Sequence, residues 1–276
     1  MMRVINAILT RNLTNFIRDR VRLFFTVFMS VLFLFIFSFV MQSTTSGITN
    51  PTNYLISGII IMTVFQAALN NSMMIIEDIS SGFMKEILVA PISRYQISIG
   101  QILSAAVIAV LQGIIILVLG LFIGLSIDIL QFIKMMVIMI VVGITFSSIG
   151  LYLAILAKNS TNFQLIISIV AMPLSFLSGA YIPTTILPSF LLPIVYLNPL
   201  TYTTSIYRYI TLGMEHYSND MLIKEGVAFD IHGFIITPYL GLIIVFIIGI
   251  IFFVLCVTQF NKADFSEVKV SKDIMF

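Results

Sequence analysis

The sequence contains six long apolar runs, and none of them includes an Asp, Glu, Lys, Arg or His residue. A helix needs about 20 apolar residues to cross the hydrocarbon core of a bilayer, and each run is long enough. Charged residues make up only 9% of the chain, whereas soluble domains carry about 25%. Such a chain lacks the ionic groups to cover a soluble globule. We therefore predict an all-α membrane protein with six transmembrane helices, at residues 23–41, 54–76, 97–127, 135–157, 163–182 and 234–257.

The basic residues predict how these helices are oriented. Three of the 14 basic residues, Lys134, Arg208 and Lys224, fall on one side of the predicted spans. Eleven fall on the other side: Arg3, Arg11, Arg18, Arg20, Arg22, Lys85, Arg94, Lys158, Lys262, Lys269 and Lys272. The side rich in Lys and Arg faces the cytoplasm. We therefore expect a multi-pass protein of the plasma (cell) membrane with both termini in the cytoplasm.

The first span is longer than the apolar core of a signal peptide, so we expect it to be retained. The segment before it, residues 1–22, has helical spacing, with Ile8, Leu9 and Phe16 on an apolar face and Arg11 and Arg18 on a polar face. This pattern predicts an amphipathic helix in the membrane interface. The alternative is an ordinary basic flank. We expect one domain, 1–276, with a six-span core at 23–260 and a cytoplasmic tail at 261–276.

Two spans have features that affect their geometry. The run at 97–127 is too long for one straight crossing, so we expect it to tilt or to extend beyond the headgroups. Pro173 is expected to kink the fifth helix, and Pro238 to kink or start the sixth.

The connector between the second and third spans, "EDISSGFMKEILVAPISRYQ" at 77–96, is charged and amphipathic rather than a short turn. Phe83, Met84 and Ile87 share one face of a predicted short helix that Pro91 must end. Ser93-x-x-Gln96 then resembles a capping box that opens the third span. The pattern predicts a coupling helix held by something outside the membrane. The alternative is a connector that lies on lipid.

Two segments resemble a known family. Glu77, Gly82 and the stretch Pro91-Ile92-Ser93-Arg94 are similar to the first cytoplasmic loop of ABC type-2 (ABC-2) permeases. Residues 177–209, which include "NPLTY" and a following arginine, are similar to that family's segment between the fifth and sixth spans. The resemblance covers essentially the whole chain and favours the drug-export, daunorubicin-resistance-like branch. The sequence departs from it at Phe83-Met84, where relatives more often carry a small polar residue and Leu.

The resemblance implies a homodimer, or a close heterodimer, of six-span subunits. Each subunit would dock a separate cytosolic ABC ATP-binding subunit, which binds ATP and Mg²⁺, so this chain would need no cofactor. ATP binding would tip the permease between inward-facing and outward-open states. The residues assigned to the docking loop are Glu77, Gly82, Phe83, Met84, Glu86, Ile87, Pro91 and Arg94.

The residues themselves also indicate an external energy source. Ion-driven carriers generally place a titratable group within the membrane, and the predicted spans have none. The dipeptide Gly-Lys does not occur, so the chain has no P-loop for ATP phosphates. A carrier that binds sodium through neutral oxygens remains an alternative.

Other classes of function are disfavoured by the same sequence. Both His216 and His232 lie outside the spans, so they form no intramembrane Ser–His pair, and their spacing fits no common metal site. We therefore expect a non-catalytic protein without a metal. The basic residues are not clustered into a patch for nucleic acid.

After the fifth span, Pro183, Pro188 and Pro193 divide the chain into short apolar pieces. We predict one or two re-entrant half-helices in the outer leaflet. Asn198 is expected to cap a further helix, with Pro199 at its first position and Gly213 after its end. The hypothesis is an external gate, and the alternative is a structural lid on the dimer. The residues assigned to the gate are Pro183, Asn198, Pro199, Tyr202 and Arg208.

Polar residues at helical spacing mark a candidate substrate path. Gln66 and Asn70 align on the second span, Gln112 lies on the third and Ser175 on the fifth. The alternative is that these residues only pack helices together. The sparse charge favours export of amphipathic drugs, peptides or lipid-like compounds. The alternative substrate is a lipid-linked polysaccharide or teichoic acid.

Overall fold

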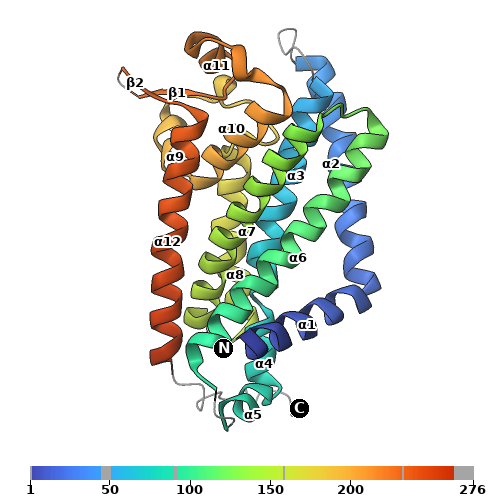
Figure 1. Ribbon diagram of the computed structural model, residues 1–276. Helices are drawn as coiled ribbons and strands as arrows, with labels where there is room; N and C mark the ends of the chain where they lie inside the picture. The colour runs from blue at the N-terminus through green and yellow to red at the C-terminus, as the bar shows by residue number, and fades with distance from the viewer. Residues whose placement is uncertain (1, 45–50, 90–91, 158, 232, 264–276) are drawn as a thin grey trace, which may run out of the picture.

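The computed structural model describes residues 2–44, 51–89, 92–157, 159–231 and 233–263. Long helices run side by side, a short helix crosses one end of them, and a small hairpin lies at the other end (Figure 1). We call these the α1 end and the hairpin end. The elements in chain order are α1 (Met2–Arg18), α2 (Arg20–Thr44), α3 (Pro51–Asn71), α4 (Met74–Ser80), α5 (Phe83–Val89), α6 (Arg94–Ile123), α7 (Ile129–Ala157), α8 (Ser160–Leu177), the 3₁₀ turns η1 (Thr184–Ile186) and η2 (Ser189–Leu191), α9 (Leu192–Leu197), α10 (Pro199–Thr211), η3 (Met214–His216), α11 (Asn219–Lys224), β1 (Phe229–Ile231), β2 (Phe234–Ile236) and α12 (Pro238–Lys262).

Within these ranges, five helical segments are long and apolar enough to cross a membrane. They are Thr52–Ser80, Arg94–Ile123, Ile129–Ala157, Ser160–Leu177 and Pro238–Lys262. Each overlaps one of the predicted runs, which confirms the all-α membrane class. Helix α2 covers the remaining run, 23–41, although its side chains are described only as far as Ile36. That α2 is a sixth span stays a prediction.

Helix α3 forms the centre of the bundle. It packs against α6, α7, α10 and α2, and the side chains of Ile60, Val64 and Phe65 are fully buried. Small residues allow its neighbours to approach closely: a Cβ atom added at Gly150 of α7 would lie 3.1 Å from the Leu69 backbone. Close contact at small residues is how helices pack inside a bilayer, where lipid competes for every apolar surface.

Two predicted helix boundaries change in the structure. The run 97–127 is not one helix, because α6 ends at Ile123 and Gly124 turns the chain with φ of 118°. At 30 residues, α6 is still longer than the about 20 residues of a straight crossing, so its tilt or its extension beyond the headgroups stays a prediction. Asp128 and Gln131 then open α7, since each backbone N–H donates to the other side chain, at 2.9 and 2.6 Å. The predicted cap of α6 is confirmed at Ser93, whose hydroxyl accepts from the Tyr95 amide at 3.2 Å.

The last two predicted spans also have other boundaries as helices than as apolar runs. Residues 234–236 form β2, which pairs antiparallel with β1. Helix α12 starts only at Pro238, where Thr237 caps it. The run 163–182 ends as a helix at Leu177, and Pro173 lies inside it.

The segment after α8 contains only short elements before α10. η1 and η2 are three-residue turns and α9 has six residues, so the re-entrant half-helices stay a prediction. Proline cannot donate a backbone hydrogen bond, so each one interrupts a helix that the apolar residues would otherwise continue. By contrast, α10 is as predicted: Asn198 caps it, Pro199 is its first residue and Gly213 follows with φ of 63°. Every residue of α10 from Leu200 to Thr211 is buried.

Candidate functional site

The short helix α5 lies at the α1 end, where the coupling helix was predicted. Met84 is buried, Phe83 and Ile87 are half-buried, and Glu86 is exposed together with Lys85. The helix is therefore amphipathic in the predicted sense, with its charged face outward. Gly82 joins α4 to α5 with φ of 82°, a backbone conformation that favours glycine. Pro91 lies outside the described residues.

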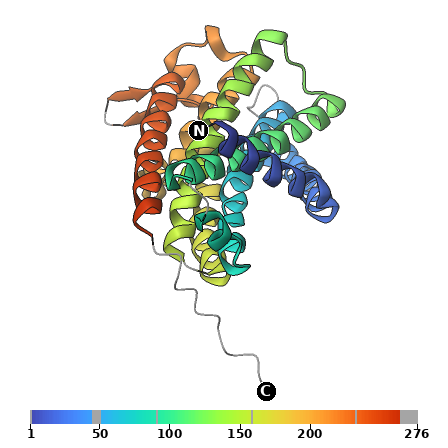
Figure 2. The ribbon, with the colours of Figure 1, turned by 60° about the horizontal axis from the view of Figure 1, so that its bottom comes forward.

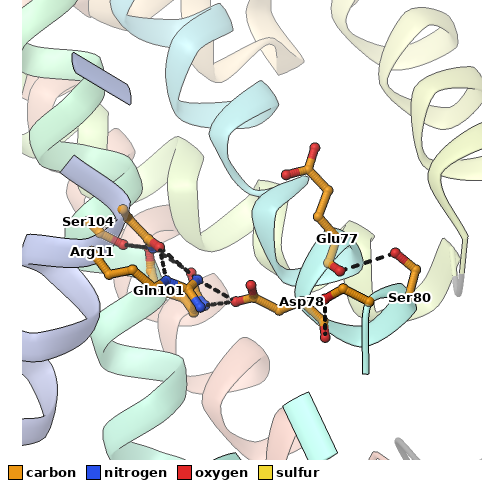
Figure 3. A network of polar contacts seen from close by, with 8 residues as sticks. Arg11, Glu77, Asp78, Ser80, Gln101 and Ser104 are labelled. Carbon is orange, nitrogen blue, oxygen red and sulfur yellow. Dashed lines mark hydrogen bonds and ion pairs between the residues drawn. The ribbon is translucent and has the colours of Figure 1, made fainter. Parts of the chain in front are cut away.

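A buried polar cluster connects this region to the rest of the bundle. Asp78 of α4 accepts hydrogen bonds from Arg11 Nη2 at 2.6 Å and from Gln101 Nε2 at 3.1 Å (Figure 3). Asn12, which is also buried, donates from Nδ2 to Gln101 Oε1 at 2.9 Å and to Ser104 Oγ at 2.8 Å. We call Arg11, Asn12, Asp78, Gln101 and Ser104 the polar cluster.

The polar cluster joins four helices. Its members come from α1, α4 and α6, and the Arg11 guanidinium also lies 4.6 Å from the centre of the Phe83 ring of α5. Figure 2 shows α1 passing across α6 at this end of the bundle. A buried carboxylate is costly unless it is paired, and here an arginine and an amide satisfy it. The cluster therefore holds α4 and α5 firmly against α1 and α6.

Sequence reasoning missed this cluster. It assigned Arg11 to the polar face of an interface helix without a partner, whereas the structure places that guanidinium against Asp78 and Phe83. The only available signal was that Arg11 and Asp78 were both predicted at the cytoplasmic boundary. Their separation of 67 residues gives no periodic pattern that would pair them.

Glu77 and Arg94 were also assigned to the docking loop, but they do not belong to the polar cluster. The Glu77 side chain projects away from the polar cluster (Figure 3) and is exposed. Arg94 Nη1 donates to the carbonyl oxygens of Asn261 and Ala263 at 3.0 and 2.7 Å. These carbonyls lie at the end of α12, where backbone acceptors lack helical partners. Arg94 thus connects the start of α6 to the end of α12.

The four predicted path residues line two adjoining cavities between α2, α3 and α8. Gln66, Asn70 and Gln112 line a cavity of about 390 Å³ next to α2. Gln66 and Asn70 also line one of about 330 Å³ next to α8, together with Ser175. We call the two together the side cavity. Its other walls are mostly apolar, with Phe33 and Tyr181 shared by both parts.

Gln66 and Asn70 are exposed although α3 is otherwise buried around them. Phe65, Ala67 and Leu69, their neighbours in sequence, are at most 6% exposed. An amide that faces hydrocarbon loses its hydrogen bonds with water and gains none in return. This face of α3 must therefore meet water or another protein rather than lipid.

At the hairpin end, the predicted gate residues make inward contacts. Arg208 of α10 is 1% exposed, and its guanidinium carbon lies 3.3 Å from the centre of the Tyr54 ring. Its Nη2 donates to the carbonyl oxygens of Gly179 and Ala180 at 3.0 and 3.3 Å. A buried cation is stabilised by such a ring face and by carbonyl oxygens.

The neighbouring gate residues also hold this segment in place. Asn198 Nδ2 donates to the Leu174 carbonyl oxygen at 2.8 Å, and the Tyr202 hydroxyl donates to the Tyr196 carbonyl oxygen at 2.5 Å. Pro183 precedes η1, and Pro199 starts α10. These contacts hold the segment against the bundle, and both the external gate and the structural lid on the dimer stay predictions.

In the ranges that the structure covers, no three His, Cys, Asp or Glu residues form a group that could hold a metal ion. His232, one of the two histidines, lies outside those ranges.

Comparison with known proteins places these features in a family context. The sequence profile described as "ABC-2 type transporter" matches residues 3–212. A protein of Cyanophora paradoxa named transport permease ycf38 is 30% identical over 231 residues, which cover 82% of this chain and 78% of that protein. The inner membrane transport permease YadH of Escherichia coli K12 is 25% identical over 211 residues, covering 74% of this chain and 72% of YadH.

Proposed function

Because this chain belongs to the ABC-2 type transporter family, a family of non-catalytic, multi-pass membrane permeases, we propose that it is the permease subunit of an ATP-driven exporter. The family implies an ABC ATP-binding partner. The observation that supports the proposal best is the polar cluster. It connects the exposed helix α5 to α6, and α6 carries Gln112 in the wall of the side cavity.

In this proposal the ATP-binding subunit docks on the charged face of α5. Lys85 and Glu86 are exposed there, while Met84 anchors the opposite face in the bundle. A push on α5 is passed to Asp78 of α4 and from there to α1 and α6, because the cluster bonds leave little freedom between these helices. To change the ratio of two permease conformations from 1:99 to 99:1, the partner must bind one of them more tightly by about 5.5 kcal/mol. ATP and Mg²⁺ are bound by the partner subunit. The α1 end then faces the cytoplasm of a plasma-membrane protein.

The side cavity is the proposed export path, and a second permease subunit covers it. The exposed amides of Gln66 and Asn70 need a polar or protein partner within the bilayer. A homodimer, or a heterodimer with a similar permease, places two such cavities opposite each other. The substrates we propose are amphipathic drugs, peptides or lipid-like compounds, because the walls combine apolar side chains with a few amides.

A second candidate substrate is a lipid-linked polysaccharide or teichoic acid. The grouping of Gln66, Asn70 and Gln112 near Phe33 and Tyr181 favours it, since sugars bind amides and aromatic faces. A screen of both compound classes for stimulation of ATP hydrolysis by the purified complex discriminates between the two.

Co-purification of this chain with its ABC ATP-binding partner tests the docking surface. Glu86→Lys is expected to abolish co-purification while leaving membrane insertion intact, because it reverses a charge on the exposed face of α5. Asp220→Lys, the same type of change at the hairpin end, is the control and should co-purify normally. Unchanged pull-down of the Glu86→Lys variant would remove α5 from the proposal.

A further inference from the structure

We propose that the α1 end of the side cavity is a head-group site for amphiphiles that carry both an anionic and a cationic group. Arg22 would bind the anionic group and Glu77 the cationic group. This inference rests on the proposed function, because it specifies the substrate class of the same path. Its evidence is the position and the pairing of these two side chains.

Arg22 and Glu77 face the same space. Arg22 lines the part of the side cavity next to α2 and two further cavities of about 320 and 160 Å³ towards the α1 end. Glu77 lines both of these further cavities. Asn70 belongs to the side cavity and to the 320 Å³ cavity, so the polar mouth is continuous with the path.

Both side chains keep unused binding capacity. Arg22 Nη2 donates to Asn71 Oδ1 at 2.8 Å, which leaves most of its five donors without a protein acceptor. The ion pairs between two described residues are Arg11–Asp78 and Lys134–Glu215, so Arg22 and Glu77 pair neither with each other nor with another charge of the described ranges. Asp19, also at this mouth, accepts the backbone N–H of Arg22 at 3.0 Å and acts as a cap.

Glu77 contrasts with the next residue. Asp78 has its charge matched by Arg11 inside the protein, whereas the Glu77 side chain points away from the polar cluster (Figure 3). An unpaired cation and an unpaired anion at one cavity mouth disfavour a ligand of a single charge sign, because one of the two would repel it. A zwitterionic head group satisfies both.

The rest of the path suits an apolar tail. Beyond Arg22, the α2 wall presents Phe25, Met29 and Phe33 opposite Ile59 and Met62 of α3, interspersed with Thr26, Ser30 and Thr63. The head group would therefore lie at the α1 end and the tail would point towards the hairpin end. Charged groups at one end and an apolar lining at the other define the orientation of the amphiphile.

Ligand-induced stabilisation of the purified full chain in maltoside micelles tests this site. Cys256 is the only cysteine and is buried, so a thiol-reactive dye reports unfolding. Three probes share a dodecyl tail: dodecylphosphocholine, dodecyl phosphate and dodecyltrimethylammonium, each added at a low ratio to maltoside. We expect dodecylphosphocholine to raise the unfolding midpoint most. Arg22→Gln and Glu77→Gln should each weaken its binding roughly tenfold, the usual effect of losing one charged contact.

Matched controls and opposing outcomes make the test specific. Arg20→Gln and Asp220→Asn remove exposed charges elsewhere and should leave the probe response unchanged. Equal stabilisation by all three probes would overturn the proposal. A second result would also overturn it. In that result, Arg22→Gln and Glu77→Gln each destabilise the chain without any probe, and the charge exchange Arg22→Glu with Glu77→Arg restores its stability. The two residues would then pair with each other. The assay contains no ATP, so a failure of ATP-driven export would contradict the proposed function and leave this result intact.

Discussion

At the residue scale, the ion pair between Arg11 and Asp78 contributes mainly by preventing an unpaired charge. The Arg11 and Asp78 side chains are 28% and 12% exposed, so the pair is only partly screened by water. Removing one partner of a buried pair costs about 3–5 kcal/mol, and partial exposure places this pair at or below the lower limit. Arg208 is almost completely buried, so leaving its charge without the groups that stabilise it would cost still more free energy.

The Arg11–Asp78 pair predicts a non-additive double-mutant cycle. We expect Asp78→Asn and Arg11→Gln each to destabilise the chain by about 2 kcal/mol, and the double variant to lose much less than the sum. Thermal unfolding followed through Cys256 measures all four proteins. Strict additivity would mean that the two residues do not interact in the folded chain.

Arg208 predicts a stability defect located at the hairpin end. Arg208→Met removes the bonds to the carbonyl oxygens of Gly179 and Ala180 and the contact with the Tyr54 ring, and should cost about 3 kcal/mol. Arg208→Lys should recover only part of the loss, because an ammonium lacks the planar stacking face. Limited proteolysis between α8 and α10 and thermal unfolding measure the effect, with exposed Lys224→Met as control. Wild-type behaviour of Arg208→Met would show that the buried contacts do not hold this segment against the bundle.

At the scale of elements, the sequence predicted what local signals specify. The Asn198-Pro199 pair marked the start of α10, Ser93 marked the start of α6, and the apolar spacing around Met84 marked α5. The hairpin was missed because three-residue strands are too short to show a period of two. The polar cluster was missed because its bonds join residues 67 and 89 positions apart, which no local pattern encodes.

Gly82 predicts how strictly α4 and α5 must be oriented relative to each other. No atom lies within 4 Å of a Cβ added there, so Gly82→Ala meets only backbone strain at φ of 82°, about 1 kcal/mol. Gly82→Pro cannot adopt this conformation, because proline holds φ near −65°. We expect the alanine variant to co-purify with the ATP-binding subunit and the proline variant to lose it while still inserting in the membrane. Normal co-purification of Gly82→Pro would show that the geometry of this joint is unimportant.

At the scale of the whole molecule, the two sides of the bundle differ. Helices α2 and α12 lie on opposite sides (Figure 1). The side with α2, α3 and α8 exposes the amides of Gln66 and Asn70 among apolar residues such as Phe25 and Met172, whereas the exposed residues of α12 near its middle are apolar, such as Phe246. An apolar surface suits lipid and a surface with amides suits a protein partner, so the proposed contact with a second permease subunit belongs on the α2–α3–α8 side.

Cross-linking tests this placement in a Cys256→Ser background. Gln66→Cys should form dimers with a short bifunctional thiol reagent, and the matched Phe246→Cys variant on α12 should not. The measurement is the fraction of dimer on a denaturing gel from membranes. The reverse pattern would place the dimer contact on the α12 side and separate the side cavity from it.

The most direct test of the whole account is flux in proteoliposomes of defined orientation. We expect this chain together with its ATP-binding subunit to move an amphipathic dye against a gradient only when ATP is supplied on the α1 side. The chain alone should move none. Uphill transport by the lone chain, or ATP-driven transport that persists when α5 is replaced by a neutral linker, would contradict the claim that the energy enters through α5 and the polar cluster.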